Sequence, residues 1–577
     1  MPTVAGCGSR SVLVAVLLVM PVLAGEARHP ARTDAVVAIL QAELDRSMAG
    51  LSKADPAPYF LSYSVTDKKT MIVMASEGAI LTSLDGHRRS LDVGMRLGSP
   101  ALDNTHEESR ASALSTAVLP LVDDPDAMRR VLWLTTDGEY KKAAQAYLKV
   151  KTGSAVHAKE EDDSPDFSKQ AAHTYIAPPL PPSQIDRAAL ESRLRAVSAE
   201  FRKQRDVYNS LVVLIVQDTT HYLVSSEGTQ VVTRERLWRA MLQGDTRTED
   251  GMDLLSVQTF QSSSFDKLPG EAEMVAAAQK IIQDLKQLRA AAPAEPFDGP
   301  ALLSGRAAAV FFHEVLGHRL EGQRQRGEKE GQTFTKKINQ AVLPGFLDVV
   351  DDPLQRQLGG TELSGAYQYD DEGVPAQRVE VIHGGILKSF LMSRMPVKNF
   401  AESNGHGRAE EGHMPVGRQG NLIVTSSLQI PDAELRTRLV EEAKKQGKPY
   451  GLYFEDIEGG FTFTQRSLPQ AFQVLPVKVW RVYADGRPDE LVRGVDIVGT
   501  PLAALTRIAV TGSSMSVFNG VCGAESGSVP VSAAAPAMLL SELEVQKRPK
   551  SKNRPPILAP PAFDEGKEPT TKTAGDK

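Results

Sequence analysis

The sequence has very little cysteine. Its 577 residues include only Cys7 and Cys522, and Cys7 precedes an apolar N-terminal run that is typical of a cleaved export signal. The mature chain would then have one thiol and no internal disulfide, even in an oxidising compartment. Such a thiol is expected either to be buried and inert or to bind a metal.

Long apolar runs and an excess of positive charge are also missing. After the N-terminal run, no stretch approaches the roughly 18 apolar residues that suggest a membrane span, so we expect none in the mature chain. The formal net charge is -6, which gives no basis for nucleic-acid binding as the main activity. These absences favour a soluble protein that acts on something other than DNA or RNA.

Residues 1–25 have the layout of a secretory signal peptide. Arg10 is the only charged residue before the apolar core "VLVAVLLVMPVLA" (12–24), and small residues follow that core. The alternative is an uncleaved N-terminal anchor. We expect cleavage and export, to the periplasm or out of the cell.

We expect an α+β protein whose N-terminal α/β domain covers residues 26–295. Ser-Glu-Gly occurs at 76–78 and again at 226–228, each time between apolar segments typical of two short strands. Helical segments flank each copy, which predicts two related helix–strands–helix units with a charged, Pro-rich linker at about 155–184. The expected helices are 34–49, about 138–150, 186–204 and 271–291.

Residues 297–546 predict a β-rich C-terminal domain with a few helices. A hairpin is expected at 378–393, turning at Gly384-Gly385, and two or three strands at 472–499, turning near Asp485-Gly486. Residues 547–577 are rich in Pro and Lys with almost no apolar periodicity, which predicts a disordered basic tail.

The stretch "FFHEVLGHRLEG" (311–322) contains His313, Glu314 and His318 in the pattern HExxxH. In a regular α-helix, residues i and i+5 point about 140° apart, so one ion could not reach both histidines. Convergence requires either a π-bulge or a helix end near Gly317, a residue type that tolerates unusual dihedral angles. The alternative is a pair of hydrogen-bonded core histidines with no metal.

A catalytic zinc site needs three protein ligands and one open position for water. His313 and His318 would supply two ligands, and the third could be His, Asp, Glu or Cys. Cys522, in "FNGVCGAESG" with glycines on both sides, is the economical choice because it also accounts for the lone thiol. Glu314, next to a ligand, is the candidate general base.

These motifs resemble the TldD/PmbA family of metallopeptidases. The pieces "HEVLGHRLEG" and "GVCG", with "DVVDDP", "YDDEGVPAQ" and "LVRGVDIVG" between them, follow the family's order over about 300–535. The resemblance implies that His313, His318 and Cys522 bind one Zn2+ per chain and that Glu314 is catalytic. It further implies a peptidase that acts on peptides or unfolded polypeptides, in a homo-oligomer or with a related subunit that lacks the motif.

The sequence also departs from that family pattern. Gln323 stands where an acid is common, and the export signal, the doubled N-terminal unit and the basic tail are unusual. The competing function is a non-catalytic binding or assembly protein with a structural metal, which would normally have four protein ligands. No fourth ligand is obvious near the motif, so the sequence favours a zinc-dependent peptidase.

Overall fold

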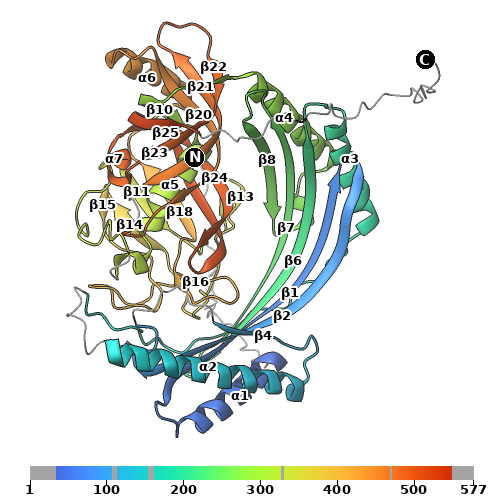
Figure 1. Cartoon of the computed structure of the whole chain (residues 1–577), viewed down its shortest axis with the longest axis vertical. Helices are drawn as coiled ribbons and strands as arrows, with labels where there is room; N and C mark the ends of the chain where they lie inside the picture. The colour runs from blue at the N-terminus through green and yellow to red at the C-terminus, as the bar shows by residue number, and fades with distance from the viewer. Residues whose placement is uncertain are drawn as a thin grey trace, which may run out of the picture. The chain divides into compact units, whose positions relative to one another are not determined.

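The chain is built around two large β-sheets (Figure 1). The computed structural model describes residues 34–106, 114–153, 162–326, 330–467, 471–548 and 556. The predicted signal peptide at 1–25 and nearly all of the predicted tail lie outside the described residues. No helix in the described part of the chain is long and apolar enough to cross a membrane.

The first sheet has eight strands in the order β3-β2-β1-β6-β7-β5, with β4 beside β2 and β8 beside β7. The elements of this region are α1 (Ala35–Leu51), β1 (Pro58–Ser76), β2 (Ala79–Ser99), β3 (Leu102–Asp103), β4 (Ser115–Val118), α2 (Pro125–Gly153), β5 (Thr174–Ile176), α3 (Arg187–Arg202), β6 (Asn209–Ser225), β7 (Gln230–Arg247), β8 (Asp253–Ser262), η1 (Phe265–Lys267) and α4 (Glu271–Ala290).

The element order contains the helix–strands–helix pattern twice, and β1 and β6 pair antiparallel at the centre of the sheet. The first hairpin turns at Glu77-Gly78, both at positive φ, as a two-residue hairpin loop requires. The prediction of short strands was wrong, because β1 and β2 have 19 and 21 residues. The charged middle of β1 stays in the ladder because Asp67 pairs with Arg89 of β2 at 2.7 Å.

The four helices cover one face of this sheet. α1 and α2 pack over one half, on residues such as Tyr63 and Val93, while α3 and α4 pack over the other half, on residues such as Val73 and Leu214. α2 begins well before the predicted start, since the side chain of Asp124 accepts a hydrogen bond from the Ala127 amide and so caps the helix. The opposite, polar face of the sheet is left without helices in the described chain (Figure 1).

The second sheet has thirteen strands, and its main path is β15-β14-β11-β18-β25-β10-β20-β21-β22-β9. The elements of this region are β9 (Ala292–Pro293), β10 (Phe297–Leu303), α5 (Gly305–Val315), η2 (Gly317–Arg319), η3 (Gly322–Gln325), β11 (Leu347–Asp351), β12 (Gln357–Leu358), β13 (Thr361–Glu362), β14 (Val379–His383), β15 (Ile386–Leu387), β16 (Gly407–Arg408), β17 (Val416–Gly417), β18 (Asn421–Ser426), β19 (Gln429–Ile430), α6 (Asp432–Lys445), β20 (Tyr450–Thr462), β21 (Phe472–Tyr483), β22 (Glu490–Arg493), β23 (Val495–Gly499), α7 (Pro501–Thr506), β24 (Ile508–Ala524) and β25 (Gly527–Lys547).

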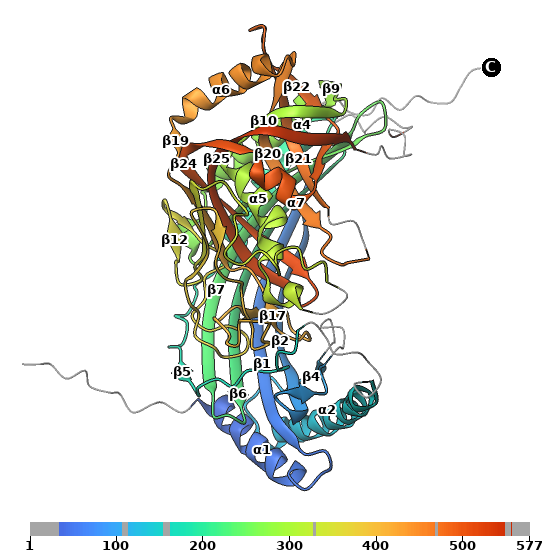
Figure 2. The same ribbon diagram turned by 90° about the vertical axis from the view of Figure 1, so that its left-hand side faces the viewer.

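Helices cover both faces of the second sheet. Alternate residues of β10 point to opposite sides, so Leu303 packs in the main core with α5 while Leu302 packs with Leu435 and Leu439 of α6 (Figure 2). The hairpin expected at 378–393 is β14–β15, turning at Gly384-Gly385 as predicted. β25 continues to Lys547, so the last strand includes the first residue of the segment assigned to the tail.

Candidate metal centre

The motif histidines lie where α5 ends. The hydroxyl of Ser304 caps the first turn by accepting a hydrogen bond from the Ala307 amide at 3.2 Å, and the helix ends at Val315. The chain then forms the short 3-10 turn η2, which contains His318. The His313 and His318 rings consequently lie 5.0 Å apart between centroids, tilted by 71°. This helix end is one of the two geometries that the spacing requires.

Steric room, rather than an unusual dihedral angle, is what the structure requires of Gly317. Its φ is not positive, so an unusual dihedral angle is not the reason for a glycine here. A Cβ at this position would instead overlap the side-chain amide of Gln419, which lies directly against the turn. Gln419 also donates a hydrogen bond of 3.5 Å to the carbonyl oxygen of His313. Glycine therefore permits a close packing contact at the helix end.

Cys522 lies next to the histidines in space, although it is far from them in the sequence. It lies on β24 and pairs with Val529 of β25. Its Sγ is 3.3 Å from Nε2 of His318, and one ligand atom from each of His313, His318 and Cys522 lies within 4.8 Å of the other two. All three side chains are buried. The structure thus brings together the three residues that the sequence analysis proposed as ligands.

Glu314 is buried beside this group. Its Oε2 lies 3.9 Å from Nε2 of His318. β20 passes close to it, since a Cβ built on Gly460 would lie 2.8 Å from Cγ of Glu314. Arg319 connects the same elements, because its guanidinium donates to the Glu314 carbonyl and to the hydroxyl of Thr462 in β20. The carboxylate of Glu314 is therefore held between α5 and β20, next to the three candidate ligands.

The thiol and the imidazoles shift each other's protonation. Burial alone would raise the pKa of the Cys522 thiol, but the nearby His318 and His313 hold that pKa well below its usual value. Burial alone would lower the pKa of His318, but the Cys522 thiolate and Glu321 hold it well above its usual value. A thiolate is thus stabilised in an apolar interior by positive charge next to it. The thiolate is also the form of cysteine that binds metals.

Glu321 and Arg418 are site residues that sequence reasoning missed. Glu321 is fully buried, and its Oε1 lies 3.1 Å from Nδ1 of His318. Burial alone would raise the pKa of Glu321, but His318 and Arg324 lower it to about 2, so it is ionised at neutral pH. A carboxylate on the second nitrogen of a ligand histidine fixes the ring and its tautomer. The position of Glu321 three residues after His318 could have indicated its role from the sequence. No local sequence feature indicates Arg418.

The residues present fit a zinc ion. Two imidazole nitrogens and one thiolate sulfur are a donor set that zinc takes in proteins. Nδ1 of His313 is buried and has no hydrogen-bond partner among the residues that the structure describes, a condition that a ligand would remove. Together with the carboxylate on His318, these features match a metal centre better than a pair of hydrogen-bonded core histidines.

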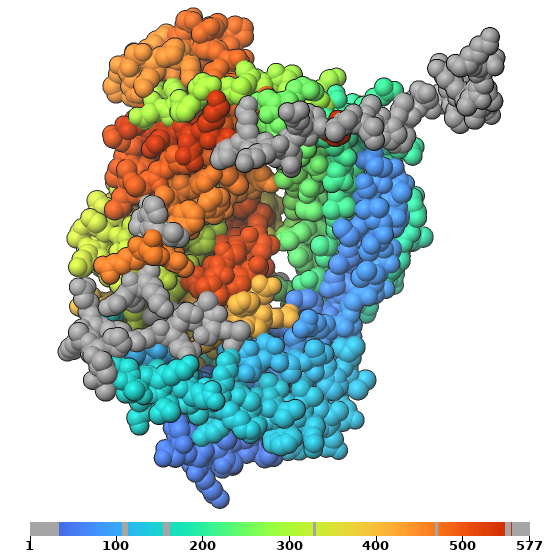
Figure 3. Space-filling model, in the orientation of Figure 1, coloured from blue at the N-terminus to red at the C-terminus, as the bar shows by residue number. Residues whose placement is uncertain are grey.

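A large cavity lies apart from this centre. It has a volume of about 740 Å³ and lies between the polar face of the first sheet and the loops and the β24–β25 hairpin of the second region (Figure 3). Ser62, Ser64 and Thr66 of β1 line one wall, and Val521 of β24 contributes to the other. Val521 is 51% exposed whereas Cys522 is 5% exposed, since successive strand residues point to opposite faces. Cys522 itself does not line the cavity, although Val529, its partner in the ladder, does.

Known proteins similar to this chain were found by sequence and by structure. Residues 298–547 match the model of the PmbA/TldA metallopeptidase C-terminal domain. A metalloprotease TldD homolog of Haemophilus influenzae is 30% identical over 290 residues, which are 49% of this chain and 55% of that protein. A zinc metalloprotease TldD homolog of Saccharolobus solfataricus is 24% identical over 400 residues, 69% of this chain and 78% of that protein.

The fold is also similar to that of a solved structure. TldE from Thermococcus kodakarensis superposes with a TM-score of 0.57 at 13% identity, covering 88% of this chain and all of that one. At this identity the similarity concerns the fold alone. The family model, in contrast, matches the region that carries HExxxH and Cys522. Residues 298–547 match the PmbA/TldA metallopeptidase C-terminal domain, so this region of the chain belongs with the TldD/PmbA family.

Proposed function

We propose that this protein is a zinc-dependent peptidase that hydrolyses peptide bonds in peptides or unfolded polypeptides. The observation that carries the proposal is the convergence of His313, His318 and Cys522 within 4.8 Å, despite a spacing that a regular helix would not allow. Relatives that share this region are named metalloproteases, and one is named a zinc metalloprotease. The chain spans about half the length of the first of them, so the activity is carried over as a proposal.

His313, His318 and Cys522 would hold the zinc, which when bound supplies Lewis-acid activation of water and of the substrate carbonyl. Glu314 would accept a proton from the attacking water and pass it to the leaving amine. Its carboxylate lies beside His318, which suits this role. Glu321 would keep the His318 ring in one orientation through its contact with Nδ1. The apolar surroundings of α5 would exclude bulk water from the reacting groups.

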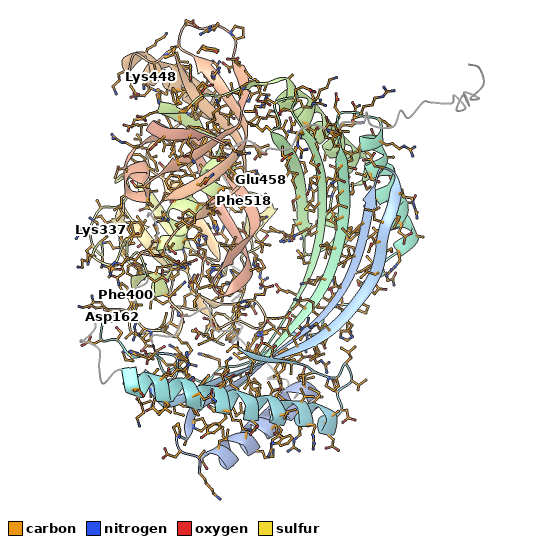
Figure 4. All side chains as sticks on the ribbon, viewed as in Figure 1. Asp162, Lys337, Phe400, Lys448, Glu458 and Phe518 are labelled. Carbon is orange, nitrogen blue, oxygen red and sulfur yellow. The ribbon has the colours of Figure 1, made fainter. Side chains whose placement is uncertain are left out.

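An extended substrate fits the strand arrangement near Glu314. β20 pairs with β10 only from Leu452 to Phe454, and farther along, its one ladder partner in the described chain is β21. Beyond Phe454 this edge of β20 has no strand partner in the described chain, although Arg306 donates to the Ile457 carbonyl oxygen. The edge runs toward Gly460, which packs against Glu314. A peptide can add to such an edge through its backbone, which gives broad sequence preference and requires an unfolded substrate. Arg306 contacts Asp456 of β20 and the ring of Phe518 in β24. Glu458 and Phe518, which belong to the same two strands, are labelled in Figure 4.

We further propose that the protein is exported and works with a second subunit, a further copy or a related chain. Export rests on the signal-like residues 1–25. The similarity of its fold to TldE is compatible with assembly from related subunits. Cell fractionation, with the mass of the mature N-terminal peptide, tests export. Sedimentation of the purified chain tests assembly, and a chain that stays monomeric and binds no related subunit would contradict it.

A structural metal is the second candidate. It is favoured by the low exposure of Glu314, which at 7% is as buried as the candidate ligands. If Glu314 were a fourth ligand, the site would be closed, as structural zinc sites are. The two functions differ in what Glu314→Gln does. In a peptidase this change keeps the zinc and removes activity, whereas in a structural site it weakens zinc binding and lowers the stability of the fold.

The decisive experiment measures the zinc content of the purified mature protein together with hydrolysis of an unstructured polypeptide such as casein. We expect about one zinc per chain, because the three candidate ligands define one site. Hydrolysis should be seen in the wild type and be lost in Glu314→Gln and Glu314→Ala, with zinc retained in Glu314→Gln. Zinc without hydrolysis in the wild type would favour the structural metal, and absence of both would overturn the proposal.

A further inference from the structure

One buried guanidinium contacts both segments that carry the candidate ligands. Arg418 lies between β17 and β18 and is fully buried. Its Nη2 donates a hydrogen bond of 2.7 Å to the carbonyl oxygen of Cys522. Its Nη1 donates to the hydroxyl of Ser526 at 2.8 Å and to the carbonyl oxygen of Gly527 at 3.0 Å. Three bonds thus attach Arg418 to the turn of the β24–β25 hairpin, beside the thiol.

The other edge of the same guanidinium faces the His318 segment. Nε of Arg418 lies 3.5 Å from Oε1 of Glu321, an ion pair rather than a hydrogen bond. The same Oε1 contacts Nδ1 of His318 at 3.1 Å. One side chain therefore links His318, through Glu321, to the backbone of Cys522. His318 and Cys522 are about 200 residues apart in the sequence.

Charge compensation alone does not account for Arg418. Arg324 already donates a hydrogen bond of 3.1 Å to Oε2 of Glu321. Burying a second cation costs free energy, and replacing buried ion pairs by apolar residues is often neutral or stabilising. What Arg418 adds is geometry, because its planar fork binds three acceptors of one turn at once while still facing Glu321. A lysine in its place would keep the charge but could not make this set of bonds.

We propose that Arg418 is a positioning residue of the metal centre, which holds His318 through Glu321 and Cys522 through its carbonyl at the spacing one zinc ion requires. The inference rests on the metal site proposed above. It predicts that the spacing of the two ligands, and therefore zinc affinity, depends on the fork of Arg418 and not on its charge alone. Loss of a supporting contact of this kind typically lowers metal affinity about 10- to 100-fold.

The test compares Arg418→Lys with the wild type. Zinc affinity is measured by competition with a chromophoric chelator, and the Co2+-substituted protein is examined for its thiolate-to-metal absorption band. We expect affinity to fall about 10- to 100-fold and the thiolate band to weaken, because the Cys522 strand is no longer held. Glu321→Gln should also lower affinity but keep the thiolate band, since it frees only the His318 side.

Arg394→Lys is the matched control. Arg394 is equally buried and binds the carbonyl of Ser168 and the carboxylate of Glu227, but it contacts none of the metal-centre residues. Its lysine variant should bind zinc and Co2+ as the wild type does. An equal loss of affinity in Arg394→Lys and Arg418→Lys would reflect general destabilisation and would overturn the positioning role.

The outcomes separate this inference from the function on which it rests. If the wild type binds no zinc, the metal site itself is wrong. If the wild type binds zinc and a folded Arg418→Lys binds it equally tightly, the site stands and the role of Arg418 falls. Should Arg418→Lys fail to fold, Ser526→Ala decides, because it removes one anchor of the fork without burying a new group. Its affinity should fall about 10-fold, and an unchanged affinity would overturn the inference.

Discussion

The two sheets differ in regularity and in what they bury. The central strands β1, β6 and β7 pair over long, unbroken registers, and their outer face packs on apolar helices. In the second sheet, the β20–β21 and β24–β25 pairs contain several register shifts. The second region also buries a run of charged and polar residues between 313 and 326, around the candidate metal centre.

The second sheet is thus the less regular of the two. Register shifts re-aim side chains, and they are over-represented next to active sites. Buried charges lower stability unless each finds a partner. Buried charge and the register shifts of β20 occur together near Glu314, whereas the register of β24 is unbroken around Cys522. The first sheet has long registers and an apolar core. Changes in the second region should therefore alter chemistry, and changes in the first should alter stability alone.

The largest effect is expected from removing a candidate ligand. His313→Ala, His318→Ala and Cys522→Ala should each reduce zinc from about one ion per chain to little or none, since two ligands rarely hold zinc tightly. Metal analysis after dialysis against a weak chelator measures this. A Cys522→Ala protein with full zinc would remove the thiol from the ligand set.

Glu314→Gln should lower the hydrolysis rate about 100- to 10,000-fold, because an amide cannot act as a general base. Zinc content and thermal unfolding should stay close to those of the wild type. Steady-state hydrolysis of an unfolded polypeptide measures the change. Wild-type rates in this variant would show that another group moves the proton.

A change in the core of the first sheet should lower stability and leave zinc affinity unchanged. Leu194 of α3 is 1% exposed in the apolar core. Leu194→Ala should lower the free energy of unfolding by about 2–5 kcal/mol through lost burial and the resulting cavity. Zinc affinity measured well below the unfolding temperature should not change. If zinc affinity fell with stability, the two regions would be coupled more closely than their separate cores indicate.

Gly317→Val should weaken zinc binding without changing a ligand, by about 10- to 100-fold, because the new side chain would push Gln419 away from the helix end. Chelator competition measures the affinity. Gly459 of β20 offers a control, since a Cβ there meets no atom within 4 Å. Equal losses in Gly317→Val and Gly459→Val would show that the contact with Gln419 is unimportant.

The smallest effect is expected at Gly138 in α2, where a Cβ would also meet open space. Gly138→Ala should raise the free energy of unfolding by about 0.5–1 kcal/mol, because glycine loses more backbone entropy in a helix than alanine. Zinc content and hydrolysis should not change. Denaturant unfolding detects the shift, and a loss of stability would indicate a local backbone that alanine cannot adopt.

Much of the fold could be predicted from local signals. Period-3.6 patterns gave the positions of α1, α3 and α4 to within a few residues, and Gly384-Gly385 marked a real hairpin. The lengths of β1 and β2 could not be predicted, because the ion pair of Asp67 with Arg89 that keeps their charged middle in the ladder is tertiary. The early start of α2 likewise depends on burial of Met128 against the sheet.

Some residues of the candidate site could likewise be predicted from the sequence, and others could not. His313, Glu314 and His318 form a local pattern, and Cys522 stands out because it is the only cysteine after the apolar N-terminal run. Glu321 could have been suspected from its position three residues after His318. Arg418 could not, because its contacts join segments that are far apart in the sequence. Crowding by a side chain at Gly317 could be expected from the sequence, but not that the distant Gln419 fills the space.

Val521 and Cys522 point to opposite faces of β24. The register of the β24–β25 hairpin therefore decides which side chain faces the histidines. If β24 slipped by one residue against β25, its side chains would change faces, and the thiol would point away from the histidines while Val521 or Gly523 took its place. A chain folded in that register would expose the Cys522 thiol to oxidants and to the thiols of other molecules. Single-residue insertions or deletions between 513 and 521 would therefore be expected to yield oxidation-prone protein that forms disulfide-linked dimers under oxidising conditions. Insertions of two residues would return the sulfur to the inner face.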